Sequence, residues 1–283
     1  RPVQALLAAA PEVLVVAPDG LPWTDPARRV DRVLAGVPVV TGGPVDDGGW
    51  ARSWLAAGRT AAAAVGEVLA EASREAAAIG AVPGQVLAAA LARATGPDDV
   101  LLVGASNPVR DLDLVGGWPE PRLVVANRGL AGIDGAVSTA TGLALGLGRP
   151  VRAYLGDLTA LHGIAGLLVG PMERRPDLQL VVAHDGGGSI FATLEHGDER
   201  LAHLVERVFA TPHGADLASL CAGYGVAHRH AGPAELDAVL AEPVVGTSLV
   251  EVRVDRVGRR AMDERLAAAV RDALDAAGGA GEV

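Results

Sequence analysis

The sequence contains no lysine, because its 24 strongly basic residues are all arginine. A mechanism that needs an amine nucleophile or a Schiff base therefore cannot be built from its side chains. The 34 acidic residues outnumber the arginines and give a net charge of −10 at pH 7. This balance argues against a nucleic-acid or anionic-membrane surface, where clustered basic residues would supply the affinity.

Cysteine and long apolar runs are also scarce. The single cysteine, Cys221, can form neither an internal disulfide nor a cysteine-rich zinc site, so a reducing compartment is expected, with the cytoplasm as the default. No apolar run approaches the roughly 18 residues of a membrane span, and the first residues do not resemble a signal peptide. Because the chain starts at Arg1 and not at methionine, we expect that upstream residues have been removed or belong to another chain.

Half of the 283 residues are apolar and 20% are charged, which predicts a folded chain with a sizeable core. Short apolar runs alternate with longer stretches rich in Ala and Leu. The expected strands are 13–16, 37–40, 100–103, 123–125, 151–155, 178–183 and 249–254. The expected helices are 51–78, 83–94, 130–145, 160–168, 216–224, 234–240 and 262–276. This alternation predicts an α/β fold, a doubly wound parallel sheet with helices on both faces.

The densest run of turn-forming residues, 42–49, contains four glycines and a proline and predicts a domain boundary. Residues 1–45 offer too few elements for a core of their own, so we expect them to be the tail of a larger domain. Residues 46–283 contain five of the expected strands with their crossovers. That is enough for one complete doubly wound domain.

Two expected strands end in residues that carry chemistry. One strand ends at Gly156-Asp157 and the next at 184–188, the sequence His-Asp-Gly-Gly-Gly. One strand–helix–strand unit separates Asp157 from Asp185, so both carboxylates return to the same edge of the sheet, where parallel sheets bind ligands. Two carboxylates beside a glycine turn suit a magnesium ion that bridges to phosphate oxygens. For Asp157 alone, the ordinary alternative is a helix N-cap.

Gly156-Asp157, followed one crossover later by a glycine turn, resembles the thiamin-diphosphate signature of the decarboxylase and carboligase superfamily. Four segments, 104–111, 127–135, 156–162 and 208–214, sharpen the match. Together they closely resemble the actinobacterial type of the 2-succinyl-5-enolpyruvyl-6-hydroxy-3-cyclohexene-1-carboxylate synthase (MenD) family, over the whole chain. The resemblance implies thiamin diphosphate with Mg²⁺ or Mn²⁺ as cofactors. It makes residues 1–45 the remnant of a central α/β domain and 46–283 the diphosphate-binding domain.

The resemblance assigns the metal to Asp157, Asp185 and the carbonyl of Gly187. His184 stands where the family usually has Asn. A register shift of one residue would make it the second ligand, although imidazole is less suited to a hard cation. The ordinary alternative for His184 is a strand-end histidine with one backbone partner.

Further positions follow from the same resemblance. The cofactor-binding residues it implies are Asn127, Arg128, Gly132, Ile133, Gly156, Asp157, Leu158, Thr159, Asp185, Gly187, Gly188, Ser189 and Ile190. The substrate-binding residues are Ser106, Asn107, Arg110, Arg128, Ile190, Phe191 and Leu194. The planar fork of Arg suits the carboxylates of acidic substrates. The ordinary alternative for Ile133 and Phe191 is a role in the core.

The remaining histidines have no spacing typical of a zinc site. His228 and His230 alternate along an expected strand, which places both rings on one face. No carboxylate or thiol is close to them in the sequence, so we interpret the pair as structural. For His213 we expect a packing role.

The family's activating glutamate lies on an N-terminal pyrimidine domain, and nothing in residues 1–45 resembles that domain. No catalytic residue is therefore expected in this chain, which should be inactive until that domain is supplied by the same precursor or a second chain. The implied reaction decarboxylates 2-oxoglutarate and adds the product to isochorismate in menaquinone biosynthesis, within a homo-oligomer. The alternatives are another carboligase, similar to acetolactate synthase, and a non-catalytic assembly fragment. We expect neither a nucleic-acid partner nor a membrane span.

Overall fold

A computed structural model of the chain describes residues 2–18, 22–23, 25, 28–37, 48–115, 117–118, 120, 122–127, 132–194, 200 and 202–279. The chain forms two compact units, Arg1–Ser53 and Trp54–Val283. The division falls inside a long helix, some residues after the boundary that the glycine-rich run predicts. The assignment of the two parts to a central and a diphosphate-binding domain stays a prediction.

The first unit contains a helix and two short parallel strands. These are α1 (Pro2–Ala9), β1 (Leu14–Val16) and β2 (Arg32–Leu34). Asp31 accepts a hydrogen bond from the backbone N–H of Val13 at 2.9 Å, and this bond holds the pKa of the Asp31 carboxyl below its ordinary value. The strand expected at 13–16 is present as β1, whereas most of the strand expected at 37–40 lies outside the described residues.

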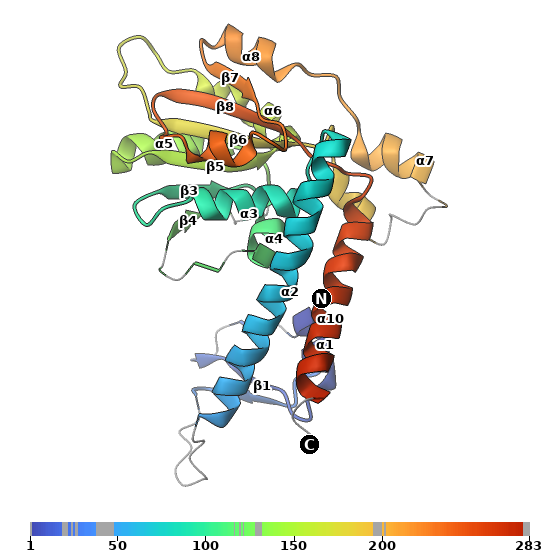
Figure 1. Cartoon of the computed structure of the whole chain (residues 1–283). Helices are drawn as coiled ribbons and strands as arrows, with labels where there is room; N and C mark the ends of the chain where they lie inside the picture. The colour runs from blue at the N-terminus through green and yellow to red at the C-terminus, as the bar shows by residue number, and fades with distance from the viewer. Residues whose placement is uncertain are drawn as a thin grey trace. The chain divides into compact units, whose positions relative to one another are not determined.

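The second unit is built on a six-stranded sheet in the order β4-β3-β5-β6-β8-β7 (Figure 1). The strands are β3 (Val100–Val103), β4 (Leu123–Val125), β5 (Val151–Gly156), β6 (Leu178–His184), β7 (Ala227–His230) and β8 (Thr247–Arg253). Every pairing is parallel, which confirms the expected fold class. The sixth strand, β7, is a polar edge strand, and it confirms the strand expected at His228 and His230 from their alternation.

Helices cover both faces of this sheet (Figure 1). The α-helices are α2 (Gly49–Ile79), α3 (Gly84–Ala94), α4 (Asn107–Val115), α5 (Ala136–Leu147), α6 (Asp157–Gly163), α7 (Ala202–Val205), α8 (Leu217–Gly223), α9 (Leu236–Ala241) and α10 (Arg259–Gly279). Two short 3-10 helices are η2 (Ile164–Leu167) and η3 (Ser189–Thr193), and η6 (Glu206–Ala210) is a short π-helix. No helix in the described part of the chain is both long and apolar enough to cross a membrane.

Alternating strand residues divide the core into two layers. Leu101 and Val103 of β3 pack with α2, α3, α4, α9 and α10. Val100 and Leu102, which point to the other face, pack with α5, α6 and α8. Since both faces of the central strands are covered, these strands read as continuous apolar runs in the sequence.

A buried arginine ties together several elements at the end of the sheet where β5 begins. The guanidinium of Arg152 donates to the backbone carbonyls of Ala94 (2.9 Å), Leu240 (2.7 Å) and Glu242 (2.9 Å). Its Nε donates to the side chain of Gln179 at 3.1 Å. One side chain thus connects β5 with β6 and with the ends of α3 and α9.

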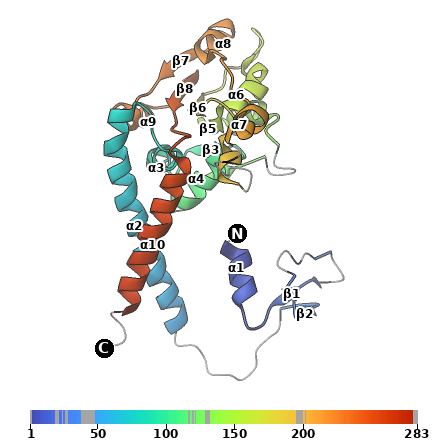
Figure 2. The ribbon, with the colours of Figure 1, turned by 90° about the vertical axis from the view of Figure 1, so that its right-hand side faces the viewer.

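Two ion pairs position α10. Arg259 binds Asp111 of α4 through two buried hydrogen bonds of 2.9 and 2.6 Å. Farther along α10, Arg265 lies 2.9 Å from Glu75 and 2.5 Å from Glu71, both on α2. Figure 2 shows α10 beside α2.

Candidate functional site

A cavity of about 390 Å³ lies beyond the carboxyl ends of β3, β5, β6 and β8. Most of the site residues expected from the sequence line it. They are Ser106, Asn107, Arg110, Ile133, Gly156, Asp157, Leu158, Thr159, Asp185, Gly187, Gly188, Ser189, Ile190, Phe191 and Leu194. Asn127 and Gly132 are not part of this lining, and Arg128 lies outside the described residues.

Asp157 is the first residue of α6 and is only 1% exposed. Its Oδ2 accepts hydrogen bonds from the backbone N–H groups of Gly186 (2.7 Å) and Gly187 (3.1 Å). The Asp157 carboxylate, which directly follows β5, therefore fixes the glycine turn that follows β6 through two hydrogen bonds. The N-cap of α6 is Gly156 and not Asp157, although Asp157 Oδ1 accepts a hydrogen bond from the N–H of Leu158 in the first turn at 2.6 Å.

The glycine turn depends on close approach of a neighbouring backbone. Gly187 has φ +149°, and a Cβ there would overlap the carbonyl oxygen of Ala210. A Cβ on Gly188 would lie 2.7 Å from the carbonyl oxygen of Phe209. The N–H of Gly188 also donates to the Ala210 carbonyl at 2.7 Å. Because no side chain fits at either position, the turn packs directly against the backbone of residues 209–210.

Asp185 belongs to a short chain of polar side chains. The hydroxyl of Ser189 donates to Asp185 Oδ2, and Asn107 Nδ2 donates to that hydroxyl at 2.8 Å. Burial raises the pKa of Asp185 to about 6, and the charge of Asp157 acts in the same direction. The Oδ1 atom of Asn107 is buried and has no hydrogen-bond partner.

Two histidines complete the surroundings of Asp157. Its Oδ2 lies 3.3 Å from His213 Nε2 and 3.7 Å from His184 Nε2. The two imidazole rings stack with centroids 5.5 Å apart. The Nδ1 atom of His184 lies 2.6 Å from Glu251 Oε1, so its partner is a carboxylate and not the backbone group considered from the sequence. His213, expected only to pack, lies at the site, and its one sequence signal is its place in the segment 208–214.

The donor set suits a divalent cation with an attached phosphate group. Two carboxylates, Asp157 and Asp185, directly follow the neighbouring strands β5 and β6, and the Cβ position of Gly186 in the glycine turn faces open space. Asp157, His184 and His213 also place one ligand atom each within 4.8 Å of one another. The residues present therefore fit a metal and diphosphate. The choice of Asp185 and the Gly187 carbonyl as further ligands stays a prediction.

The arginines of the cavity differ in their surroundings. Arg110 is exposed and donates to the carbonyl of Ser106 at 2.6 Å. Ser106 itself has φ +75°, an uncommon conformation for a residue other than glycine. Arg256 follows β8 and binds Glu206, but its Nη1 is buried and has no hydrogen-bond partner. No motif contains Arg256, so sequence reasoning missed it.

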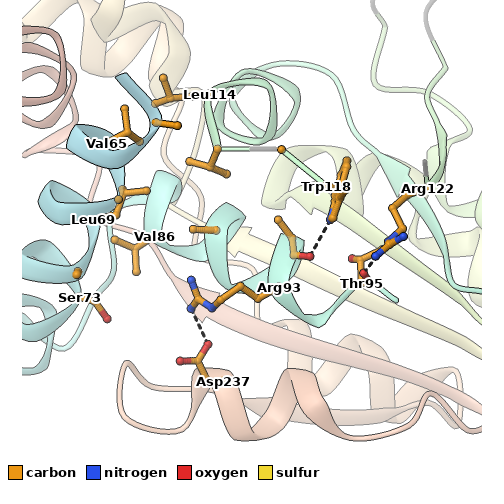
Figure 3. Close-up of a pocket in the computed structure, with 17 residues that line it drawn as sticks. Val65, Leu69, Ser73, Val86, Arg93, Thr95, Leu114, Trp118, Arg122 and Asp237 are labelled. Carbon is orange, nitrogen blue, oxygen red and sulfur yellow. Dashed lines mark hydrogen bonds and ion pairs between the residues drawn. The ribbon is translucent and has the colours of Figure 1, made fainter. Parts of the chain in front are cut away.

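A larger cavity of about 840 Å³ lies elsewhere, between α2, α3 and α4 (Figure 3). Its walls are mostly apolar. Among the described residues that line it, Trp118 donates to the Ala92 carbonyl at 2.9 Å and Arg122 to the Thr95 carbonyl at 3.2 Å. Arg93 pairs with an aspartate of α9 at 2.8 Å. These polar groups already have partners, whereas Asn107 Oδ1 and Arg256 Nη1 at the sheet edge are buried without one.

Comparison with solved structures supports the fold. The chain superposes with a TM-score of 0.50 and 17% identity on the thiamine diphosphate-dependent 4-hydroxybenzoylformate decarboxylase of Rhodococcus jostii RHA1, over 62% of this chain and 33% of that one. At this identity the likeness concerns the fold alone. The chain thus has an α/β fold found in thiamine-diphosphate-dependent enzymes.

Sequence comparison is more specific. The chain is 45% identical to a 2-succinyl-5-enolpyruvyl-6-hydroxy-3-cyclohexene-1-carboxylate synthase of a Nocardioides species, over 95% of this chain and 51% of that protein. It is 42% identical to the synthase of Saccharopolyspora erythraea, over 97% of this chain and 48% of that protein. No family model matches it. The chain belongs to this synthase family and spans about half the length of these curated relatives.

Proposed function

We propose that this chain is the C-terminal part of a thiamin-diphosphate-dependent synthase of this family. The whole enzyme would decarboxylate 2-oxoglutarate and add the resulting succinyl semialdehyde carbanion equivalent to isochorismate in menaquinone biosynthesis. The 45% identity over 95% of the chain supports the proposal. The main structural observation behind the proposal is the buried Asp157, which accepts hydrogen bonds from the N–H groups of Gly186 and Gly187 at the edge of the sheet.

The chain's part in this function is to hold the cofactor. Asp157, Asp185 and the Gly187 carbonyl would bind Mg²⁺ or Mn²⁺, and the metal would neutralise the negative charge of the diphosphate beside two carboxylates. When bound, thiamin diphosphate supplies a thiazolium carbon that adds to a keto group. Ile133 lines the cavity from the segment just before α5, where it would support the bound ring system.

Other cavity residues would exclude water from the reacting carbon and bind the substrate carboxylates. Ile190, Phe191 and Leu194 form an apolar part of the lining, which excludes water and so protects a carbanion from protonation. Phe191 packs against Phe209 with ring centroids 5.3 Å apart, which fixes its position. Arg110 would bind a substrate carboxylate through its planar fork. We assign the same role to Arg128 on the sequence motif.

The chain needs a second half. We infer that a pyrimidine-binding domain, on the same precursor or on another chain, supplies the activating glutamate, and that sites form between subunits of a homo-oligomer. Residues 1–45 would then be the end of the central domain, and 46–283 the diphosphate-binding domain. The free, buried thiol of Cys221 is compatible with a cytoplasmic location, which we also propose.

Calorimetric titration tests the cofactor assignment on the chain itself. Thiamin diphosphate with Mg²⁺ should bind, whereas thiamin without phosphates should not. Asp157→Asn keeps an acceptor for the glycine N–H groups but loses the charge, and should weaken binding by about tenfold or more. Asp216→Asn is the matched control. Asp216 caps the exposed start of α8, where Asn caps equally well, so cofactor binding should not change.

Two results would redirect the proposal. No binding, even with the N-terminal half of a relative added, would favour a non-catalytic assembly fragment. The reconstituted enzyme should decarboxylate 2-oxoglutarate, and Arg110→Ala should reduce this activity. A preference for pyruvate that is insensitive to Arg110→Ala would instead indicate an enzyme similar to acetolactate synthase.

A further inference from the structure

A second group of metal-ligating side chains lies on the outer strands of the sheet. His228 and His230 are two residues apart on β7 and therefore share a face. β7 pairs with β8 so that His230 lies opposite Glu251. The carboxylate that the sequence did not place near these histidines is therefore beside them in space. We call these three residues the edge-strand cluster.

The ligand atoms of the edge-strand cluster converge. Glu251 Oε2 lies 2.8 Å from His228 Nε2 and 3.7 Å from His230 Nε2. All three ligand atoms lie within 4.8 Å of one another. A tetrahedral Zn²⁺ ion with bonds of about 2.0–2.2 Å holds its ligand atoms about 3.3 Å apart. The observed separations bracket this value, so small side-chain movements would accommodate the ion.

The surroundings of the cluster also resemble those of a metal site. The side chains of His228 and Glu251 are 11% and 6% exposed, whereas that of His230 is 65% exposed. The site is thus anchored inside the protein and open on one side. The second oxygen of Glu251 lies 2.6 Å from His184 Nδ1. Such a partner behind a ligand fixes its orientation and is typical of metal centres.

A simple ion pair between His228 and Glu251 explains only part of this geometry. It does not require His230 to turn its Nε2 toward the same carboxylate oxygen, and an exposed edge-strand histidine is free to point elsewhere. The rings of His228 and His230 meet edge to face, with centroids 4.9 Å apart and an interplanar angle of 85°. In this arrangement the Nε2 atoms of both imidazoles lie near the same oxygen, Glu251 Oε2.

We propose that His228, His230 and Glu251 bind a divalent transition-metal ion, with Zn²⁺ as the best match. Two imidazole nitrogens and one carboxylate suit zinc, whereas Mg²⁺ prefers oxygen ligands only. The fourth position, on the exposed side of His230, is open to water. Since the ligands come from two strands, the ion links the edge strand β7 to β8. This site uses none of the metal ligands of the proposed cofactor site, although Glu251 also contacts His184, which lies 3.7 Å from Asp157.

Titration of the full chain with zinc chloride, followed by calorimetry and thermal unfolding, tests the proposal. Wild-type protein should bind zinc and melt at a higher temperature in its presence. His230→Ala should weaken this binding by about tenfold or more and abolish the shift. Arg229→Ala is the matched control on the same strand, because Arg229 pairs with the exposed Glu242 at 2.9 Å, outside the cluster. This control should bind zinc like the wild type.

Substituting cobalt for zinc reports the coordination directly, because tetrahedral Co²⁺ has intense visible absorption bands. These bands should appear in the wild type and disappear in His228→Gln, which keeps a hydrogen-bonding side chain beside Glu251 and so favours retention of the fold. Circular dichroism checks that fold. If both histidine variants bind zinc as the wild type does, or if His213→Ala alone removes the binding, the metal sits elsewhere and the proposal is wrong.

Discussion

At Gly187 the backbone conformation and the neighbouring chain exclude every side chain. Its φ of +149° is a region that glycine alone tolerates well, and the carbonyl of Ala210 occupies the space of a Cβ. The two constraints are independent, so repacking of the neighbour alone would not relieve the strain. The glycine turn is therefore fixed in shape before any ligand arrives.

We predict that Gly187→Ala lowers the free energy of unfolding by about 2–4 kcal/mol, the sum of backbone strain and overpacking. Urea denaturation measures this change. Gly142→Ala is the control, since Gly142 is exposed on α5 with open space around its Cβ position. That substitution should be neutral or stabilising by up to about 1 kcal/mol. Equal effects of the two substitutions would show that the turn is not constrained as described.

At the scale of elements, the pair Arg259–Asp111 joins α10 to α4. Burial raises the pKa of Asp111, and the hydrogen bonds from Arg259 act against this. The carboxylate therefore depends on its partner to remain charged in the core. Removing one member of such a pair is far more costly than replacing both.

We predict that Arg259→Met lowers the free energy of unfolding by about 3–5 kcal/mol, because Asp111 is left buried without a counter-charge. Adding Asp111→Leu should recover most of this loss. The exposed pair Arg93–Asp237 provides the comparison, and Arg93→Met should cost about 1 kcal/mol or less. Urea unfolding at neutral pH gives all three values. A loss at Arg259 as small as that at Arg93 would contradict the prediction.

The elements differ in how well the sequence predicts them. The strands at 100–103 and 123–125 are correct to the residue, because their apolar runs are short and bounded by turn residues. The helix expected from 130 begins at Ala136, directly after Gly135 with φ +67°. Helix α4 was missed, because its sequence was interpreted as a binding motif. Its polar residue Asp111 binds Arg259, which lies 148 positions away in the sequence.

The candidate site shows the same limit. Strand ends and glycine turns can be recognised locally, so the sequence alone places Asp157 near the glycine turn at one edge of the sheet. Glu251 is 67 positions from His184 and carries no motif, so only the strand order brings the two together. His213 and Arg256 likewise enter the site through loops whose paths depend on the complete fold.

At the scale of the whole molecule, Cys221 reports on the cooperative unfolding of the sheet and its helices. It lies on α8, fully buried in the core layer formed with β3, β5, β6 and β8. Burial raises the pKa of its thiol to about 11, whereas the ordinary value is 9.0. The unfolded chain thus loses this proton first. The stability linked to the protonated thiol is complete below pH 9 and is lost as the pH rises toward 11.

We predict that wild-type protein loses about 1.4 kcal/mol more stability than Cys221→Ala when the pH rises from 8 to 10. The comparison removes alkaline effects that the two proteins share, including the titration of the buried Tyr154, whose pKa burial also raises. Urea unfolding at both pH values measures the difference. Parallel losses in the two proteins would mean that the thiol is not buried in the folded state.

The hydrogen bonds from the buried Arg152 to distant backbone carbonyls have a consequence for folding during synthesis on the ribosome. Its backbone acceptors at Leu240 and Glu242 lie 88 and 90 positions further along the chain. Until residue 242 has emerged from the ribosome, the Arg152 guanidinium of the nascent chain lacks the carbonyl acceptors of Leu240 and Glu242. This set of hydrogen bonds can therefore be completed only after the segment through residue 242 has been translated.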